Sequence, residues 1–235
     1  MASDYYPLLE TQKLTKEYFR KDGSLVKALD GINLKVNSGE FLAIVGRSGS
    51  GKTTLLNILG ALDRPTFGDV ILEGKNLKDH SNKELSLLRR QKIGFVFQTF
   101  NLLPTLTARE NIELALVRHQ LSSKEIKRKV EIWLGFLEIM DEMNSFPHEL
   151  SVGQQQKVAI ARALVKDPIL ILADEPTGEM DPLSGKEIIK KLLELKNKYK
   201  VTLIFATHSP FSYKLADRVL FITDGEFVPK NKSQY

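Results

Sequence analysis

The chain of 235 residues contains no cysteine, which excludes a disulfide framework and a thiolate-ligated metal site. It also has no stretch of 18 or more apolar residues, so we expect no membrane-spanning helix. The first ten residues, MASDYYPLLE, include two acids and no apolar run, so we expect no signal peptide there. These absences are compatible with a reducing compartment, and work at a membrane would require another chain to supply the spans.

A large excess of one charge sign is missing as well. Lysine and arginine number 34 against 29 acids, and the net charge of +5 is spread along the chain rather than gathered in one block. That distribution is typical of a solvated surface, and contact with phosphate ligands, anionic lipid head groups or nucleic acid is the alternative. With 42% hydrophobic residues, the chain can bury a core within one large domain or within a core that carries an insertion.

Short apolar runs alternate with amphipathic segments along the chain. Buried strands are predicted for the runs EFLAIVG (40–46), IGFVFQ (93–98), PILILADE (168–175) and VTLIFATH (201–208). Helices are predicted for TTLLNILGAL (53–62) and GKEIIKKLLELKNKYK (185–200). Hairpin patterns occur at 68–77, after the first of these helices, and at 217–228, near the end of the chain. We therefore expect an α/β fold whose mainly parallel sheet is covered on both faces and joined by an antiparallel β subdomain.

The middle of the chain has a different pattern. Beyond IGFVFQ, residues 99–165 show no strand pattern, and Ser122 with Glu125 fits a capping box that opens a helix. An apolar stripe at helical spacing follows, with Trp133 at its centre, and it predicts core positions. We expect one domain over residues 1–235, with its core at about 8–98 and 166–228 and a helical insertion at about 99–165.

The segment GRSGSGKTT (46–54) matches the phosphate-loop pattern G-x-x-x-x-G-K-[ST] in full. Its glycines let successive backbone N–H groups point at phosphate oxygens, and the following helix adds its positive end. The lysine, Lys52, reaches the β- and γ-phosphates, and the Thr53 hydroxyl ligates Mg²⁺. A glycine-rich turn without a ligand is the alternative, but the preceding strand and the following helix favour a P-loop NTPase.

Three further polar residues follow predicted strands. Asp174 and Glu175 end PILILADE, where Asp174 can hold Mg²⁺ and Glu175 can orient a water molecule. His208 ends the next strand, where it can sense the γ-phosphate. In isolation, the two acids read as exposed turn carboxylates and the histidine as a structural residue.

In LSVGQQQKVAIARAL (150–164), Ser151 either only caps a helix or belongs to a helix start that holds an anion.

These motifs resemble those of the ATP-binding cassette (ABC) ATPases. They occur in the order found in that family, and the resemblance covers about residues 9–228. Gln98 matches the Q-loop glutamine, LSVGQ (150–154) the signature, LILADE (170–175) the Walker B strand and GEMD (178–181) the D-loop. His208 matches the switch histidine, and Tyr18, beside Phe19, lies where the family places an aromatic that stacks on adenine.

Motifs and resemblance together assign the site. Catalytic roles fall to Lys52, Glu175 and His208, and Mg²⁺ ligation falls to Thr53, Gln98 and Asp174. Contacts with ATP fall to Tyr18, Gly46, Arg47, Ser48, Gly49, Ser50, Gly51, Lys52, Thr53, Thr54, Gln98, Ser151, Gly153 and Asp181.

The resemblance implies that two cassettes pack head to tail around two ATP molecules, so that the signature of each copy meets the γ-phosphate bound by the other. Ser151 and the N–H of Gly153 are then donors to that phosphate. The chain departs from the usual two-glycine motif at Val152. Because a β-branched residue tolerates positive φ poorly, the backbone there is either ordinary or strained. We expect the Val152 side chain to point away from the phosphate.

The segment FVFQTFNLLPTLTARENIELAL (95–116) is similar to the corresponding segment in one branch of the family, whose members export macrolides, release lipoproteins or handle antimicrobial peptides. It departs from that branch at Ala115, where a proline is expected. In that branch the segment docks a membrane subunit. The apolar residues Phe100, Leu102 and Leu103 then line part of a surface groove, or else belong to the core of the insertion.

The resemblance implies an ATPase subunit that dimerises around Mg-ATP and drives a separate membrane permease from the cytoplasmic face, with no nucleic-acid partner. Three alternatives remain at this point: a soluble ABC ATPase of the DNA-repair or iron–sulfur type, a P-loop kinase, and an ATP-binding regulator that does not hydrolyse. A kinase has no use for LSVGQ or GEMD, and the presence of Glu175 and His208 opposes the regulator.

Overall fold

The computed structural model describes residues 7–229 of the chain, so the first six residues of the MASDYYPLLE segment lie outside it. The strands are β1 (Leu9–Phe19), β2 (Leu25–Val36), β3 (Phe41–Val45), β4 (Phe67–Leu72), β5 (Lys75–Asn76), β6 (Ile93–Val96), β7 (Leu170–Asp174), β8 (Thr202–Thr207), β9 (Arg218–Thr223) and β10 (Glu226–Val228). The helices are α1 (Lys52–Leu59), α2 (Asn82–Lys92), α3 (Ala108–Glu113), α4 (Ser123–Phe136), α5 (Val152–Leu164), α6 (Pro182–Tyr199) and α7 (Pro210–Tyr213).

The strands form two sheets. One has four antiparallel strands in the order β2-β1-β4-β5, and the other has six strands in the order β10-β9-β3-β8-β7-β6. In the larger sheet the neighbours from β9 to β6 are parallel, and only β10 runs antiparallel, against β9. The expected α/β fold with a mainly parallel sheet and an antiparallel β subdomain is therefore confirmed.

The strand register brings three strand ends together. Val45, the last residue of β3, lies opposite Thr207, the last residue of β8. Asp174, the last residue of β7, lies opposite Ala206. Because the three strands are parallel and in register, the segments that follow them, beginning at Gly46, Glu175 and His208, leave the sheet at one edge.

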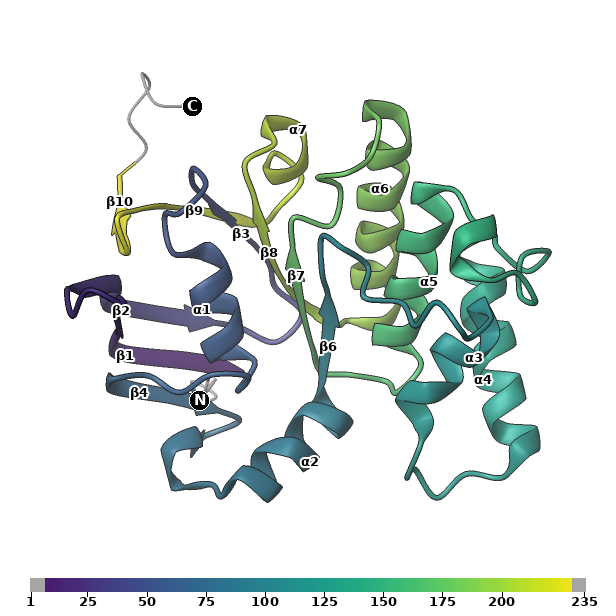
Figure 1. The fold of residues 1–235 in the computed structure, drawn as a ribbon, viewed down its shortest axis with the longest axis horizontal. Helices are drawn as coiled ribbons and strands as arrows, with labels where there is room; N and C mark the ends of the chain where they lie inside the picture. The colour runs from purple at the N-terminus through teal and green to yellow at the C-terminus, as the bar shows by residue number, and fades with distance from the viewer. Residues whose placement is uncertain (1–6, 230–235) are drawn as a thin grey trace, which may run out of the picture.

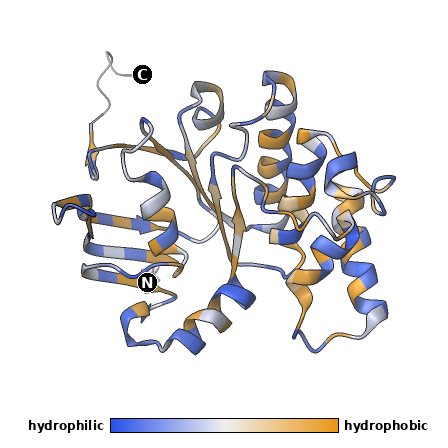
Figure 2. Ribbon diagram, in the orientation of Figure 1, coloured by the Kyte–Doolittle hydropathy of each residue, from blue (hydrophilic) through white to orange (hydrophobic). Residues whose placement is uncertain are grey.

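Alternate residues of the parallel strands enter two different cores, because successive strand side chains point to opposite faces. On one face, Phe41 and Phe205 pack with residues of α3, α4, α5 and α6. On the other, Leu42 and Ile204 pack with α1 and with the antiparallel sheet. Figure 1 shows this layering, and in Figure 2 the central strands are orange along most of their length. Burial on both faces explains why these strands are continuous apolar runs rather than alternating ones.

Helices α3, α4 and α5 occupy the middle of the chain, where no strand was expected, and lie at one end of the molecule in Figure 1. Ser122 caps α4 in a capping box with Glu125, and Ser81 caps α2 in the same way with Glu84. The α4 residues Val130 and Trp133 share one buried cluster with Phe205 of the parallel sheet. The helical segment is thus joined to the sheet by continuous apolar packing.

Within residues 7–229, none of the helices combines the length and the apolar character that crossing a bilayer requires.

Candidate functional site

The phosphate-loop pattern lies between β3 and α1, as the sequence predicts. Gly51 precedes the helix with a φ of 104°, a conformation that L side chains rarely adopt. A Cβ atom at Gly51 would also lie 2.5 Å from the carbonyl oxygen of Ala28, and one at Gly46 would lie 2.5 Å from that of Ile222. Glycine is therefore required at both positions, and the loop backbone can turn tightly into the first turn of α1. Arg47, Ser48 and Gly49 are exposed at its tip.

Lys52 begins α1, and its side chain is 5% exposed. Its ammonium group donates to the carbonyl oxygens of Gly46, at 2.8 Å, and Arg47, at 3.0 Å. The same nitrogen lies 3.5 Å from Glu175 Oε1. The lysine is thereby held across its own loop with its charge next to the acid that follows β7.

Thr53 and Asp174 meet although 121 positions separate them in sequence. The Thr53 hydroxyl donates to Asp174 Oδ2 at 2.6 Å, whereas the buried Asp174 Oδ1 has no hydrogen-bond partner. Burial raises the pKa of Asp174, the Thr53 hydrogen bond partly offsets that rise, and the charge of Glu175 adds to it. An orphaned carboxylate oxygen beside a hydroxyl is a donor set that suits a hard cation.

Glu175 sits between two cationic or ionisable side chains. Its Oε2 lies 2.5 Å from Nδ1 of His208, which follows β8, while Oε1 faces Lys52. The Glu175 backbone has a φ of 44°, which is uncommon for a residue other than glycine and is held by a hydrogen bond from its N–H to the Ala206 carbonyl. Such local strain is frequent at functional sites. The structure thus brings Lys52, Glu175 and His208 together.

Gln98 and Asp181 have partners outside this group. Gln98 Nε2 donates to Glu179 Oε1 at 2.7 Å, so the glutamine contacts the GEMD segment. Asp181 is the N-cap of α6 and accepts from the N–H groups of Leu183 and Ser184, at 3.0 and 3.1 Å. Neither residue makes a hydrogen bond to the group around Lys52 in the described part of the chain.

Ser151 is the N-cap of α5, and its hydroxyl accepts from the N–H of Gln154 in a capping box. Val152 is the first residue of the helix, lies outside the residues with positive φ, and is 41% exposed. The backbone at the departure from the usual motif is therefore ordinary rather than strained. Gly153 lies against the side chain of Met180, since a Cβ atom there would be 3.5 Å from Met180 Cε.

The three glutamines of α5 have separate structural roles that the sequence did not reveal. Gln154 completes the capping box, and Gln155 Nε2 donates to the Leu150 carbonyl at 3.0 Å. Gln156 is fully buried, and its Nε2 donates to the Pro176 carbonyl at 2.7 Å. Because Pro176 follows Glu175, this bond ties α5 to the loop that carries the acid. A long polar side chain on an otherwise apolar helix face was the available signal.

Tyr18 lies near the end of β1, and its side chain contacts the turn after α1. Its hydroxyl donates to Asp63 Oδ2 at 2.8 Å. The residue is 40% exposed. Neither Asp63 nor its other partner, Lys16, was singled out in the sequence.

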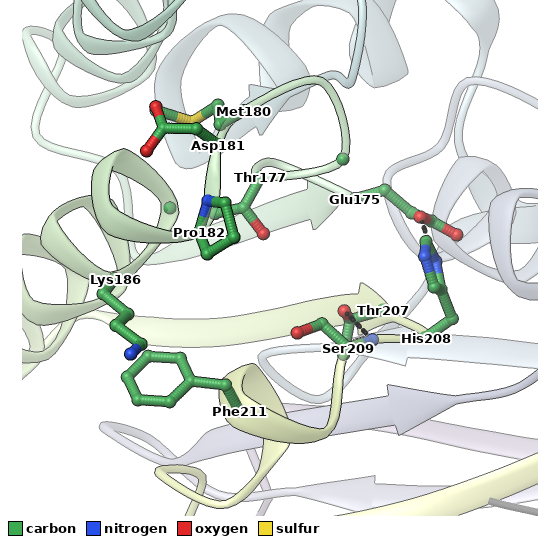
Figure 3. Close-up of a pocket in the computed structure, with 12 residues that line it drawn as sticks. Glu175, Thr177, Met180, Asp181, Pro182, Lys186, Thr207, His208, Ser209 and Phe211 are labelled. Carbon is green, nitrogen blue, oxygen red and sulfur yellow. Dashed lines mark hydrogen bonds and ion pairs between the residues drawn. The ribbon is translucent and has the colours of Figure 1, made fainter.

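A cavity of about 260 Å³ extends from Glu175 and His208 to the start of α6. Figure 3 shows Glu175 and His208 pointing toward each other at one side of it and Asp181 with Met180 at another. Gly178 of the GEMD segment also lines it, as do Lys186 and Phe211, whose ring centroid lies 5.3 Å from the Lys186 ammonium. Among the described residues, those of the phosphate loop lie outside this lining, so the cavity adjoins the phosphate-binding loop instead of containing it.

A phosphate loop after β3, an acid-bearing β7 and the parallel sheet that aligns them define a P-loop NTPase. The chain belongs to the ABC transporter family, whose model matches residues 29–178. It is an ATP-binding subunit of an ABC transporter and an ATPase, as the sequence predicted. Relatives named as transporter components do not support the alternative of a soluble ABC ATPase without a transport role.

Two relatives and one solved structure show how far the similarity extends. The ABC transporter ATP-binding protein MJ0796 of Methanocaldococcus jannaschii is 41% identical over 96% of this chain and 97% of its own length. The macrolide export ATP-binding/permease protein MacB of Nitrosomonas europaea is 43% identical over 97% of this chain but only 34% of its own length. A solved dimeric structure of MJ0796 in a post-hydrolysis state, bound to ADP and Pi, matches with a TM-score of 0.88 at 40% identity, covering 95% of this chain and 98% of that one.

Proposed function

We propose that this subunit binds Mg-ATP at the edge of the parallel sheet, closes on a second copy of itself around the nucleotide, and transmits that closure to a separate membrane permease. The observation that carries the proposal is the convergence of Lys52, Thr53, Asp174, Glu175 and His208 from the ends of two strands, β7 and β8, and the start of one helix, α1. The dimeric structure of the MJ0796 cassette supports dimer closure. Relatives named as ATP-binding/permease proteins support a permease partner.

Each residue of the group has a defined task in hydrolysis. Lys52 and the amides of the phosphate loop stabilise the negative charge that develops on the γ-phosphate. Glu175 accepts a hydrogen bond from the attacking water and orients it, and His208 donates to the γ-phosphate. The contact between Glu175 and His208 keeps both side chains at the same strand edge. Ser151 and the N–H of Gly153, with the remaining loop residues, bind phosphate oxygens at the dimer interface.

The residues present fit a magnesium ion. The unpartnered Asp174 Oδ1 and the Thr53 hydroxyl offer hard oxygen ligands, and Gln98, in the loop after β6, would add an amide oxygen. When bound, the ion neutralises charge on the β- and γ-phosphate oxygens. Thr53 and Asp174 would hold it in place, and their mutual hydrogen bond already sets their positions.

The loop after Gln98 supplies the permease contact in this proposal, which places the subunit on the cytoplasmic face of the membrane. Leu103 is 44% exposed, whereas Phe100 and Leu102 are half-buried. The fully buried Asn111 pins the loop through hydrogen bonds to the backbone of Leu103, and Arg162 donates to the Phe100 carbonyl. A rigid loop that presents an exposed leucine is suited to receive an apolar anchor from a partner.

The test is copurification from membranes with a co-expressed permease subunit. Leu103→Asp should lose that partner, while the ATPase rate of the isolated subunit stays within about twofold of wild type, because Leu103 lies outside the site. Leu25→Asp is the matched control, since Leu25 is similarly exposed, at 49%, but lies on β2 of the antiparallel sheet. Retention of the partner by Leu103→Asp, or its equal loss in both variants, would contradict the proposed surface.

A further inference from the structure

Tyr18, Asp63 and Lys16 form a closed set of contacts at the end of β1. The Tyr18 hydroxyl donates to Asp63 Oδ2 at 2.8 Å, and Lys16 Nζ donates to Asp63 Oδ1 at 2.8 Å. The Lys16 ammonium also lies over the Tyr18 ring, 4.8 Å from its centroid. Each of the three side chains is thus restrained by the other two.

Asp63 reaches this position because of how α1 ends. After Leu59 the chain turns through Ala61, which has a left-handed φ of 56°. The N–H groups of Leu62 and Asp63 then donate back to the Asn57 carbonyl, at 2.8 and 3.3 Å. These bonds tie the turn to the body of the helix, so the Asp63 carboxylate has a fixed position relative to the first turn of α1, which carries Lys52 and Thr53.

Helix α1 therefore links the phosphate loop to the residues around Tyr18. Its first turn belongs to the phosphate loop, and the turn after it fixes Tyr18 through Asp63. Lys16 lies over the ring of Tyr18, yet the residue remains 40% exposed, which leaves surface for a base to contact.

We propose that Asp63 is a positioning residue for nucleotide binding: it sets the orientation of the Tyr18 ring relative to the phosphate loop so that base and phosphates are bound together. This inference rests on the proposed role of Tyr18 as the surface on which the base stacks. Asp63 acts only through Tyr18 and Lys16, and it does not touch the phosphates.

The protonation states support the geometry. Burial alone would raise the pKa of Asp63, but hydrogen bonds from Lys16 and Tyr18 outweigh it, and the pKa lies below its ordinary value. Burial and the bond to Asp63 raise the pKa of Tyr18. At neutral pH the aspartate is therefore charged and the tyrosine keeps its proton, which is the combination that the Tyr18 to Asp63 hydrogen bond requires.

The test compares a ligand that carries a base with one that does not. Titration calorimetry of the full chain with ADP and with inorganic pyrophosphate measures the two affinities. Asp63→Ala should weaken ADP binding about fivefold, which is part of the value of one base stack, and leave pyrophosphate binding within about twofold. In steady-state kinetics the KM for ATP should rise by a similar factor while kcat is unchanged. Asp63→Asn, which keeps an oxygen acceptor, should restore part of the loss.

Further variants guard against a general loss of structure. Tyr18→Phe keeps the ring but removes its hydroxyl, so it should resemble Asp63→Ala, and the double variant should be no worse than either single variant. Asp69→Ala is the matched control, because Asp69 lies on β4 of the same antiparallel sheet and pairs with Lys78 without contacting Tyr18; it should leave the affinity for ADP unchanged.

Three outcomes would overturn the inference, and they are distinguishable. If Tyr18→Ala weakens ADP binding but Asp63→Ala and Tyr18→Phe do not, Tyr18 stacks on the base without needing Asp63, and only the positioning role fails. If Tyr18→Ala has no effect on ADP binding, the proposed role of Tyr18 fails and the positioning role with it. Equal weakening of ADP and pyrophosphate binding by Asp63→Ala would also exclude a role specific to the base.

Discussion

Glu175 and His208 lie 2.5 Å apart, Oε2 to Nδ1, although they follow different strands and are 33 positions apart in the chain (208 minus 175). The contact exists because β7 and β8 are parallel neighbours in register, with Asp174 opposite Ala206. The second carboxylate oxygen of Glu175 faces Lys52 at 3.5 Å. One acid therefore links the phosphate loop to the residue after β8, and removing its charge should affect both.

Glu175→Gln tests the composite site. The amide cannot accept the water's proton, so phosphate release should fall by at least about 100-fold. Binding should persist, so Mg-ATP should convert the variant from monomer to dimer in size-exclusion chromatography with light scattering. Glu194→Gln, which changes a solvent-exposed acid on α6, should hydrolyse ATP normally. A Glu175→Gln protein that stays monomeric at saturating Mg-ATP would mean either that Val152 disables the signature or that closure requires the permease, and adding Val152→Gly distinguishes these explanations.

Val152→Gly tests the departure in the signature motif. The valine has ordinary helical backbone at the start of α5 and a side chain that is 41% exposed, so nothing at this position requires a glycine. We expect ATPase activity within about twofold of wild type and a small loss of stability, about 0.5 kcal/mol, from the greater freedom of glycine in the unfolded chain. A several-fold rise in ATPase activity or in ATP-dependent dimer would show instead that the valine side chain hinders closure.

Asp174→Asn should raise the stability of the protein and lower its ATPase activity. Burial raises the pKa of Asp174, so the native state holds the proton more tightly than the unfolded chain does. The free energy of unfolding therefore falls as the pH rises from the unfolded-state pKa to the higher native-state pKa. At neutral pH the charged carboxylate opposes folding, and the neutral amide removes that penalty. The nucleotide-free variant should therefore melt at a higher temperature, while Mg²⁺-dependent hydrolysis falls by about 10- to 100-fold.

The matched control for Asp174→Asn is Asp69→Asn, because the two carboxylates shift in opposite directions. Hydrogen bonds from Lys78 and Asn76 lower the pKa of Asp69, so its charge favours folding and the amide should not raise the melting temperature. Equal stabilisation by both substitutions would show that burial of Asp174 is not the cause.

Lys166 offers a pH test away from the site. Burial, with the charge of Arg162, lowers the pKa of Lys166 to about 8, and its ammonium donates to the Arg89 carbonyl at 2.9 Å. Between pH 8 and the ordinary value of 10.5, the unfolded chain binds more protons than the native state, so stability rises with pH across that interval. Lys166→Met should therefore be more stable than wild type at pH 7, by about 1–2 kcal/mol once the lost hydrogen bond is counted.

The advantage of Lys166→Met should shrink as the pH approaches 10.5, because the lysine is then neutral in the native state and increasingly neutral in the unfolded chain. Urea unfolding of the two proteins from pH 7 to pH 10 measures the difference directly. A difference that stays constant with pH would show that Lys166 is charged in the native state throughout.

Local patterns in the sequence determined much of this protein. Glycines at the phosphate loop, the capping box at Ser122, and uninterrupted apolar runs all act within a few residues. They predicted the parallel sheet, the helical middle and the roles of Lys52, Asp174 and Glu175 before any contact was known. These features are readable because backbone conformation and burial depend on residue type and short-range spacing.

Only the tertiary structure decided which distant groups meet. The register between β7 and β8 places His208 beside Glu175. The buried Gln156 donates to the Pro176 carbonyl, and the turn after α1 places Asp63 next to Tyr18. Residues such as Gln156 and Asp63 have no motif, because a hydrogen bond between segments depends on how elements pack rather than on their neighbours in sequence. The sequence by itself determined the elements and the phosphate loop, and packing determined the partners of each polar side chain.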